Sequence, residues 1–448
     1  MAENDLNNTR VKEHLGIVTS DTNTTHFNFY LSLFKNRIEV GKDDYVLVDH
    51  PIYGSVCPLL AVLKEIKSYE EIVGTTSLGE KSVRLMALGE ILGYLDLRNP
   101  NRLIQRLSMP PDPGSKVYQP YAEFLEDIFQ RDLEGKPIRQ PLHIGRVGSN
   151  PIGRDGSPKP LNFYFDPQGQ IRRHILITGM SGVGKTHTAS VIVEELSNRT
   201  GDPVVIFDPY GEYNTIGVAS EWFNKLAQDG GVSPKEYPFS FKVKVYAPDP
   251  DGVQHNFEGS GFKLEDNPRY SVQKTPERWA SSTNEQAKKA DKDEFKQAVS
   301  HDQITIFNSV GLSSEEKSSF YTFCAKTLWN NRIDGGVEPF LLVVERPEDI
   351  DADALLALAC DGRRYGVSLC LLSQHPAKVD SRILSQMGTQ LMGRTTDAGD
   401  LDRLKGMAGE DVGLLPKLRP GEWIVNGIEL ARPTKVFIRE RYSQPPVI

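Results

Sequence analysis

The chain reads Gly179-Met180-Ser181-Gly182-Val183-Gly184-Lys185-Thr186 directly after the apolar run Ile175-Leu176-Ile177-Thr178. This pattern is typical of a phosphate-binding loop (P-loop) between a strand and a helix. Its glycines let successive backbone N–H groups turn inward around a phosphate chain, and the helix adds its positive N-terminal end. We expect residues 179–187, His187 included, to bind a nucleoside triphosphate. Lys185 is expected at the β- and γ-phosphates, and the Thr186 hydroxyl at Mg²⁺.

The composition is ordinary for a soluble protein of several domains. With 448 residues, 38% of them hydrophobic and 25% charged, the chain is too long for one core. The most apolar stretch, 45–63, contains Asp49, His50 and two prolines, so we expect strands there and no membrane span. The net charge of −8 gives no general affinity for nucleic acid, which would need a local basic patch.

The cysteines and the N-terminal residues favour a cytoplasmic protein. The four cysteines, at positions 57, 324, 360 and 370, show no C-x-x-C spacing and lie in apolar runs, as expected of reduced buried thiols. The first residues have neither the basic nor the apolar region of a secretion signal.

Residues 1–140 predict a small β-barrel followed by a helical connector. Alternating residues at 26–33 and the run 44–49, which follows a turn at 41–43, are typical of short strands. Helices are expected at about 80–92 and 121–129.

Residues 141–415 predict a domain with a parallel sheet. Apolar runs at 203–208, 304–307, 340–344 and 367–372 alternate with helical patterns, as in βαβ units. We expect a polar, helical insertion at about 216–300, whose charged run at 288–294 favours a solvated segment over a dedicated binding face. Residues 416–448 are expected to form C-terminal strands and a tail.

Two acidic residues stand at the ends of predicted buried strands, where sheets of this class place their sites. Asp208 and Glu345 are therefore candidate Mg²⁺ ligands together with Thr186. A small GTPase is disfavoured because no Asn/Thr-Lys-x-Asp segment follows. A protein kinase is excluded because no H-R-D segment is present.

Several segments outside the P-loop carry a family resemblance. They are, in chain order, His143-Ile144-Gly145-Arg146, Arg173-His174-Ile175, Asp208-Pro209-Tyr210-Gly211-Glu212-Tyr213, Asp361-Gly362-Arg363-Arg364-Tyr365-Gly366-Val367, Leu372-Ser373-Gln374-His375-Pro376 and Arg394-Thr395-Thr396. With the P-loop, and in this order, they resemble the HerA family of hexameric DNA-translocating ATPases, relatives of FtsK. The match covers most of the chain and is weakest over 67–140 and 250–300.

The resemblance implies an α/β fold: a RecA-like P-loop core with a parallel-rich sheet, preceded by a small N-terminal β-barrel. It implies ATP and Mg²⁺ as ligands. Gln374 matches a residue that senses the γ-phosphate or the attacking water. The family's arginine fingers, which enter the neighbouring subunit's site, match Arg363 or Arg364 and Arg394, and Arg173 matches an arginine that assists the site.

One position departs from the family pattern. Two adjacent acids usually follow the apolar strand, and the second is the catalytic base, whereas this chain has Glu345-Arg346. Arg346 is a cation and cannot accept a proton from water, so another residue must be the base. Glu345 could be both cation ligand and base, or the carboxylate of Glu348 or Glu212 could be the base. Slow or absent hydrolysis is the fourth alternative, so the rate of turnover stays open.

Two functions follow from the resemblance. The first is a hexameric ring that moves double-stranded DNA through its channel, as a helicase or translocase. Such a ring would work with a NurA-like nuclease or another effector in DNA end processing, DNA repair or antiviral defence. The alternative is an ATP-binding scaffold that assembles and activates a partner with little translocation, which Arg346 and the acidic balance favour. Neither reading involves a membrane.

Overall fold

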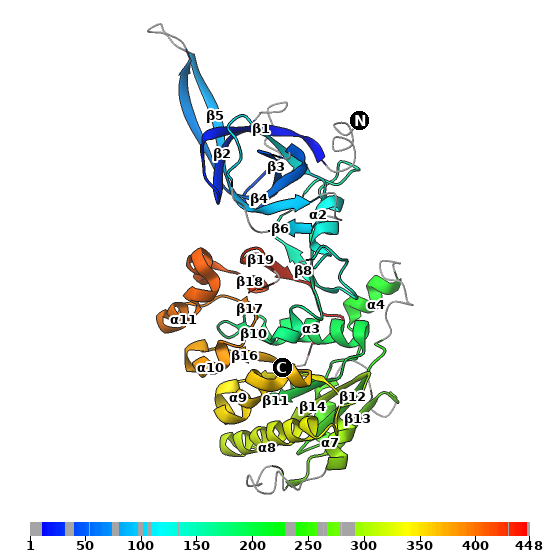
Figure 1. Ribbon diagram of the computed structural model, residues 1–448. Helices are drawn as coiled ribbons and strands as arrows, with labels where there is room; N and C mark the ends of the chain where they lie inside the picture. The colour runs from blue at the N-terminus through cyan, green and yellow to red at the C-terminus, as the bar shows by residue number, and fades with distance from the viewer. Residues whose placement is uncertain are drawn as a thin grey trace. The chain divides into compact units, whose positions relative to one another are not determined.

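The computed structural model (Figure 1) describes residues 11–31, 40–52, 54–73, 80–96, 102–104, 109–132, 134–149, 151–228, 239–257, 263, 267–277, 279, 292–428 and 430–445. The chain forms two compact units. The first contains residues 1–139, 145–164 and 429–432, and the second contains 140–144, 165–428 and 433–448. None of the described helices combines the length and hydropathy that a membrane span requires.

The first unit is a closed β-barrel. Its strands are β1 (Val11–Thr22), β2 (His26–Leu31), β3 (Tyr45–His50), β4 (Gly54–Val73), β5 (Glu80–Asp96), β6 (Arg102–Ile104) and β7 (Lys116–Pro120). They pair in the order β2-β1-β7-β3-β4-β5-β6, and an additional pairing of β2 with β5 closes the ring. Apolar side chains that alternate along these strands fill the interior, among them Phe27, Phe29, Val46, Leu59 and Val117. The predicted barrel is therefore confirmed.

The helix expected at 80–92 is wrong, because these residues belong to β5. Burial alternates along the segment, with Ala87 and Gly89 inside and Leu88 and Glu90 turned outward, which is the period of a strand. The strand is held on both sides, by β4 and by β2. A Cβ at Gly89 would lie 2.5 Å from the Phe27 ring, so the glycine admits that ring to the core. The helix expected at 121–129 is confirmed as α2 (Ala122–Phe129).

The second unit is built on a mostly parallel sheet. Its strands run in the order β13 (Tyr270–Lys274), β12 (Lys242–Ala247), β14 (Gln303–Asn308), β11 (Val204–Asp208), β15 (Phe340–Glu345), β16 (Val367–Ser373), β10 (Ile175–Thr178) and β17 (Thr389–Met392). These pairs are parallel, whereas β18 (Glu422–Gly427) and β19 (Thr434–Ile438) extend the sheet as antiparallel strands. The chain passes between the units along β8 (Leu142–Val147) and β9 (Asn162–Phe165).

Helices cover this sheet. They are α3 (Lys185–Thr200), α4 (Glu221–Gln228), α7 (Lys292–Ala298), α8 (Ser314–Ile333), α9 (Ala352–Asp361), α10 (Ser381–Leu384) and α11 (Ala398–Ala408). In Figure 1, α8, α9 and α10 lie together along the sheet, and α3 lies apart from them. An apolar cluster of buried residues joins the sheet to α8 and α9 through Phe207, Phe307 and Phe320. Helix α8 begins with a capping box formed by Ser313 and Glu316.

The segment 216–300, expected as a polar helical insertion, contributes β12 and β13 to the edge of the sheet. The lysines of β12 interrupt its apolar residues, so the sequence pattern does not indicate a buried strand there. Lys244 is nevertheless buried, with its ammonium group 5.0 Å from the centre of the Tyr246 ring, so its apolar stem replaces a hydrophobic side chain. Most of the charged run 288–294 lies outside the described residues.

Candidate functional site

The P-loop joins the carboxyl end of β10 to α3. In the sheet β10 pairs with β16 and β17, so that β16 separates it from β15, the strand that ends in Glu345. Gly179, Gly182 and Gly184 have φ angles of 154°, 77° and 98°, which side chains other than glycine rarely adopt. The backbone of Arg394 supports the turn, because its carbonyl accepts the Met180 N–H at 2.9 Å.

Lys185 is folded onto its own loop. Its Nζ donates to the carbonyls of Gly179 at 2.9 Å and Met180 at 3.0 Å. Burial lowers the pKa of this lysine, while the nearby carboxylates of Glu345 and Glu212 oppose the shift. The ammonium group is therefore held at the loop, where a phosphate chain would lie.

Three oxygen-bearing side chains converge at the start of α3. The Thr186 hydroxyl oxygen lies 2.6 Å from Glu212 Oε2 and 2.8 Å from Glu345 Oε1. The Tyr213 hydroxyl donates to the same Glu345 oxygen at 3.2 Å. A threonine hydroxyl has one proton, so it cannot donate to both carboxylates at once. One of the two contacts thus requires a protonated carboxyl group or a bound cation.

Glu345 is the carboxyl group that holds a proton most readily. Burial at the end of β15, reinforced by the charges of Asp208 and Glu212, raises the pKa of Glu345 to about 8, although hydrogen bonds from Thr186 and Tyr213 oppose the shift. Near neutral pH this residue is therefore mostly protonated.

Asp208, expected as a metal ligand, lies behind the cavity. Its carboxylate is buried and accepts the backbone N–H groups of Tyr210, Gly211, Glu212 and Tyr213. Burial raises the pKa of Asp208 to about 6 despite these bonds. The residue fixes the turn that carries Glu212 to Thr186, so its contacts in this structure are structural.

The donor set at Thr186 fits Mg²⁺. This ion prefers oxygen ligands and is usually bound by one or two carboxylates together with substrate phosphates. Thr186, Glu345 and Glu212 offer such oxygens. Among the described residues no group of three or more His, Cys, Asp or Glu side chains could hold a metal ion by itself. Bound there, Mg²⁺ would neutralise charge on the phosphates.

A cavity of about 310 Å³ opens beside the loop. Of the predicted residues, those that line it are Ser181, Gly182, Gly184, Lys185, Thr186, His187, Glu212, Glu345 and Gln374. Besides Arg346, four lining residues had been given no role as ligands: Tyr210, Leu372, Arg441 and Pro445. Tyr210 lies in the quoted D-P-Y-G-E-Y segment, whereas no motif marks the last two, which lie more than 250 residues from the loop in sequence.

Arg346 also lines this cavity, where the family pattern has an acid. It is exposed, its φ of 56° places it in the left-handed region, and its Nε lies 2.6 Å from Asp349 Oδ2. Its Nη1 donates to the Tyr210 hydroxyl at 3.2 Å. Glu348 accepts the Ser373 hydroxyl at 3.5 Å and does not line the cavity, although its charge also acts on Lys185. Of the three alternatives for the missing acid, Glu212 and Glu345 are thus in place.

The four predicted arginines lie outside the cavity of their own protomer. Arg173 precedes β10, and Arg363 and Arg364 precede β16, so they lie at the edge of the sheet opposite the P-loop. The seven residues of β16 span roughly 23 Å. Arg363, Arg364 and Arg394 are exposed, and Arg394 lies beside the loop through its backbone. The structure of one chain does not bring these side chains together with Lys185.

The raised pKa of Glu345 predicts a pH-dependent gain in stability for Glu345→Gln. An acid whose pKa is higher in the folded than in the unfolded protein lowers the free energy of unfolding as pH rises between the two values. For Glu345 this interval runs from its ordinary value, about 4.5, to about 8. The variant lacks this loss, so its melting temperature relative to wild type should increase from pH 5 to pH 8 and then level off.

Thermal melts of the nucleotide-free proteins check this expectation. Glu315→Gln, at an exposed position of α8, is the matched control and should track wild type. Parallel melting curves for Glu345→Gln and wild type across this pH range would contradict the assignment.

The chain is similar to several known proteins. Residues 142–302 match the family model of the HerA helicase central domain. A probable helicase of Methanocaldococcus jannaschii is 23% identical over 93% of this chain and 88% of its own length. A probable DNA double-strand break repair helicase HerA of the same organism is 25% identical over 94% of both chains. The DNA double-strand break repair helicase HerA of Sulfolobus acidocaldarius is 24% identical over 74% of both chains.

Among solved structures, VirB4 of Thermoanaerobacter pseudethanolicus aligns with 66% of this chain and 96% of its own, at 15% identity and a TM-score of 0.37, too low a score to support an argument. The sequence relatives span most of the chain, and the central-domain match contains the P-loop. Together with the convergence of Lys185, Thr186, Glu212 and Glu345 on one cavity, they identify the chain as a member of the HerA family of P-loop ATPases.

Proposed function

We propose that the protein is an ATP-driven motor that moves along double-stranded DNA as a ring, with Mg²⁺·ATP bound at the P-loop. The observation that carries the proposal is the meeting of the Thr186 hydroxyl with Glu212 and Glu345 beside Lys185. This set provides phosphate binding, oxygen ligands for a cation and a carboxylate for the attacking water. Relatives that span most of the chain are described as helicases, which supports DNA as the substrate.

In this proposal Glu212 is the general base. It is only partly buried and lines the cavity, whereas Glu345 is buried at the end of β15, where one of its oxygens is in contact with the hydroxyl groups of Thr186 and Tyr213. A base must be ionised at the working pH to accept a proton from water. Glu345 then supplies a ligand to the cation, and Gln374 orients the γ-phosphate or the water from the end of β16.

Arginines from the neighbouring copy complete the site in this proposal. Arg363 and Arg364 are exposed, and no ion pair joins either of them to another residue within the described ranges. They lie too far from their own P-loop to reach it, so they are available to a second copy. A guanidinium placed beside the transferred phosphate stabilises the charge of the transition state. Arg394 and Arg173 are further candidates, and a closed hexamer is the expected ring.

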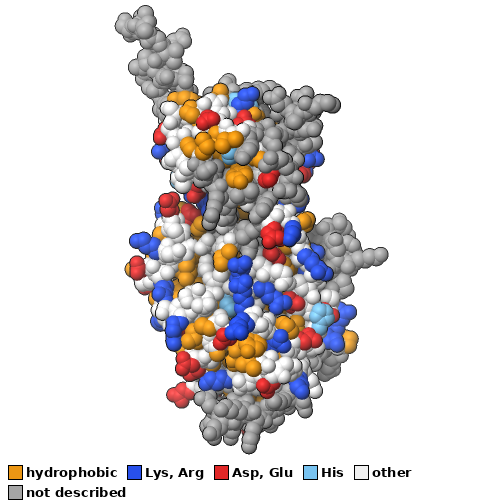
Figure 2. All heavy atoms as spheres, in the orientation of Figure 1, with side chains coloured by type: hydrophobic (Ala, Val, Ile, Leu, Met, Phe, Trp, Pro, Cys, Tyr) orange, Lys and Arg blue, Asp and Glu red, His pale blue; other side chains and the backbone are white. Residues whose placement is uncertain are grey.

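The DNA is expected to follow the ring's central channel through contacts with its phosphates. Such contacts are largely independent of sequence and weaken as salt rises. The net charge of −8 does not oppose this, because local charge decides the contact. On the face of the larger unit turned to the viewer, Figure 2 shows basic side chains gathered near the middle with acidic ones around them.

A nuclease or another effector is the expected partner, and the barrel is its expected docking site. Ile17 and Tyr30 stand opposite each other on β1 and β2 and are 47% and 40% exposed, an apolar pair on the barrel's outer surface. With a NurA-like nuclease the assembly would process DNA ends, and with a defence effector it would act against phage. The proposed location is the cytoplasm.

A scaffold that binds ATP and activates a partner without processive movement is the second candidate. Arg346 favours it, because this cation lines the cavity at the position where the family pattern has a second acid. In that case hydrolysis would be slow and independent of DNA.

Steady-state ATP hydrolysis with and without linear double-stranded DNA separates the two functions. For a motor we expect DNA to stimulate hydrolysis, and Lys185→Ala to abolish both the basal and the stimulated rate, because the phosphate loses its cation. A wild-type rate equal to that of Lys185→Ala, with nucleotide still bound, would contradict the motor and leave the scaffold.

Glu212→Gln should lower kcat by about a hundredfold or more while ATP affinity stays within a few fold, since loss of a general base affects the chemical step. Glu348→Gln is the matched control, because its carboxylate faces Ser373, and it should retain the wild-type rate. The measurement is kcat together with ATP binding by fluorescence. Equal rates for the two variants would exclude Glu212 as the base.

Subunit mixing tests the arginines. The double variant Arg363→Ala/Arg364→Ala and the variant Lys185→Ala should each be inactive alone. In mixed rings, an intact P-loop meets intact arginines at about one interface in four, so a 1:1 mixture should regain roughly a quarter of the wild-type rate. Arg382→Ala, a change at an exposed arginine paired with Asp380, should be active without mixing. A mixture that stays inactive, or an active double variant, would contradict the assignment.

A further inference from the structure

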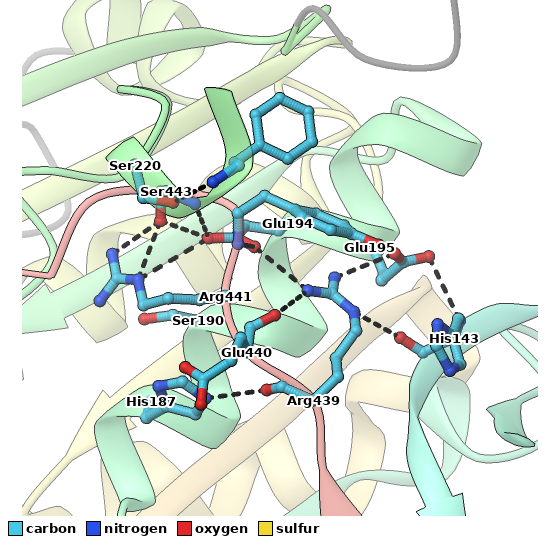
Figure 3. Close-up of polar contacts among 12 residues, drawn as sticks. His143, His187, Ser190, Glu194, Glu195, Ser220, Arg439, Glu440, Arg441 and Ser443 are labelled. Carbon is cyan, nitrogen blue, oxygen red and sulfur yellow. Dashed lines mark hydrogen bonds and ion pairs between the residues drawn. The ribbon is translucent and has the colours of Figure 1, made fainter. Parts of the chain in front are cut away.

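The C-terminal residues 439–445, here called the C-terminal strap, lie against the P-loop helix and form part of the nucleotide cavity. Figure 3 shows the strap crossing α3, with Arg439 and Arg441 turned toward Glu195 and Glu194. Arg441 and Pro445 line the cavity together with Lys185, Thr186 and His187. The His187 ring Nε2 lies 2.9 Å from the Arg439 carbonyl oxygen, next to the loop itself.

Two buried carboxylates on α3 anchor the strap. Glu194 accepts the backbone N–H groups of Tyr442 at 2.9 Å and Ser443 at 3.0 Å, and also the Ser443 hydroxyl. Glu195 accepts Arg439 Nη2 at 2.9 Å. A buried carboxylate without such partners is strongly unfavourable. These two side chains therefore bind the strap to α3 rather than merely contacting it.

The other side of the strap is packed as well. The Arg439 guanidinium lies 3.7 Å from the centre of the Tyr442 ring, and the rings of Phe223 and Trp222 have their centres 5.2 and 6.3 Å from it. The Tyr442 carbonyl accepts the Ser220 N–H at 2.9 Å. The strap thus lies between the P-loop helix and the segment that begins α4, and its path is fixed from both sides.

Arg441 is the strap residue with unused hydrogen-bonding capacity at the cavity. Its side chain is 5% exposed. Nε and Nη2 donate to the Ser443 hydroxyl at 3.0 and 2.7 Å, and Nη2 also approaches the Thr215 hydroxyl at 3.5 Å. Nη1 makes no hydrogen bond within the part of the chain that the structure describes. Burial lowers the pKa of Arg441, but a guanidinium stays charged at neutral pH.

We propose that Arg441 is a nucleotide-binding residue, which the C-terminal strap holds at the cavity so that its free guanidinium edge contacts a phosphate oxygen of the nucleotide bound to the same protomer. Arg439, Glu194 and Ser443 are positioning residues. The inference rests on the proposed binding of ATP at the P-loop and adds a cis cation to it. By linkage, a nucleotide that contacts the strap must also stabilise the docked strap.

Nucleotide affinity of the full chain tests the proposal. The probe is a fluorescent ADP displaced by ADP or ATP in the presence of Mg²⁺, measured for wild type, Arg441→Gln, Arg441→Lys and Lys185→Ala. Arg441→Gln should weaken both nucleotides at least about tenfold, the loss expected for one hydrogen bond to a charged group. Arg441→Lys keeps the positive charge but loses the planar set of donors, so its affinity should lie between those of wild type and Arg441→Gln. Arg382→Gln, at an exposed arginine, is the control and should match wild type.

These outcomes separate the inference from the proposed function. Wild-type binding that is lost in Lys185→Ala supports the P-loop site, and unchanged affinity in Arg441→Gln then overturns the inference alone. Equal losses in Arg441→Gln and Arg441→Lys would show a structural role and overturn it as well. Absence of nucleotide binding in wild type overturns both.

Hydrogen exchange of the wild-type protein tests the same proposal without the Arg441→Gln variant, in case that variant does not fold. Mg²⁺·ADP should slow amide exchange at Tyr442 and Ser443, whose N–H groups bind Glu194, and it should not do so in Lys185→Ala. Slower exchange at the P-loop without any change in the strap would overturn the proposal.

Discussion

A single threonine hydroxyl shared by two carboxylates is the constraint on which the site depends. Thr186 has one proton, yet its oxygen lies within hydrogen-bonding distance of both Glu212 and Glu345. In the protein alone this contact requires a proton on one carboxyl group, and burial favours Glu345 as its carrier. A divalent cation would replace that proton and allow both carboxylates to ionise. The arrangement is therefore costly without a cation and suited to one that accompanies a triphosphate.

The fold brings these three residues together by separate means. The glycine turn after β10 sets the start of α3 and thereby Thr186, while the buried strand β15 ends at Glu345. Glu212 lies on a turn that Asp208 stabilises, because the Asp208 carboxylate accepts four backbone N–H groups within it. The strap then fixes α3 from behind through Glu194 and Glu195. The P-loop, the end of β15 and the turn after β11 are far apart in sequence, but all three lie at the carboxyl edge of the parallel sheet.

The sequence predicted the parts of this site that follow local rules. The P-loop and the acid at the end of β15 were found because each combines a motif or a charged residue with an adjacent apolar strand. Asp208 was found for the same reason, but the sequence does not show whether a strand-end acid points into the cavity or into its own turn. Arg441 was missed because the ion pairs that place it join residues far apart in the chain, and no local pattern marks it.

The errors in the fold have similar causes. Residues 80–92 have helical spacing of apolar side chains, but the pairing of β5 with β4 and β2 overrides that preference. Lys244 makes β12 read as a polar segment, although its stem packs against Tyr246 in the sheet. The pairing partners of a strand and the burial of its long charged side chains depend on the tertiary structure. They are set by the rest of the chain and not by the segment itself.

The most direct measurement is a cryo-EM map of the protein with Mg²⁺ and a slowly hydrolysed ATP analogue. We expect phosphate density within the turn 179–186 and a cation in contact with Thr186 Oγ1 and Glu345. An empty turn at saturating nucleotide, or a triphosphate bound away from Lys185 and Thr186, would contradict this expectation.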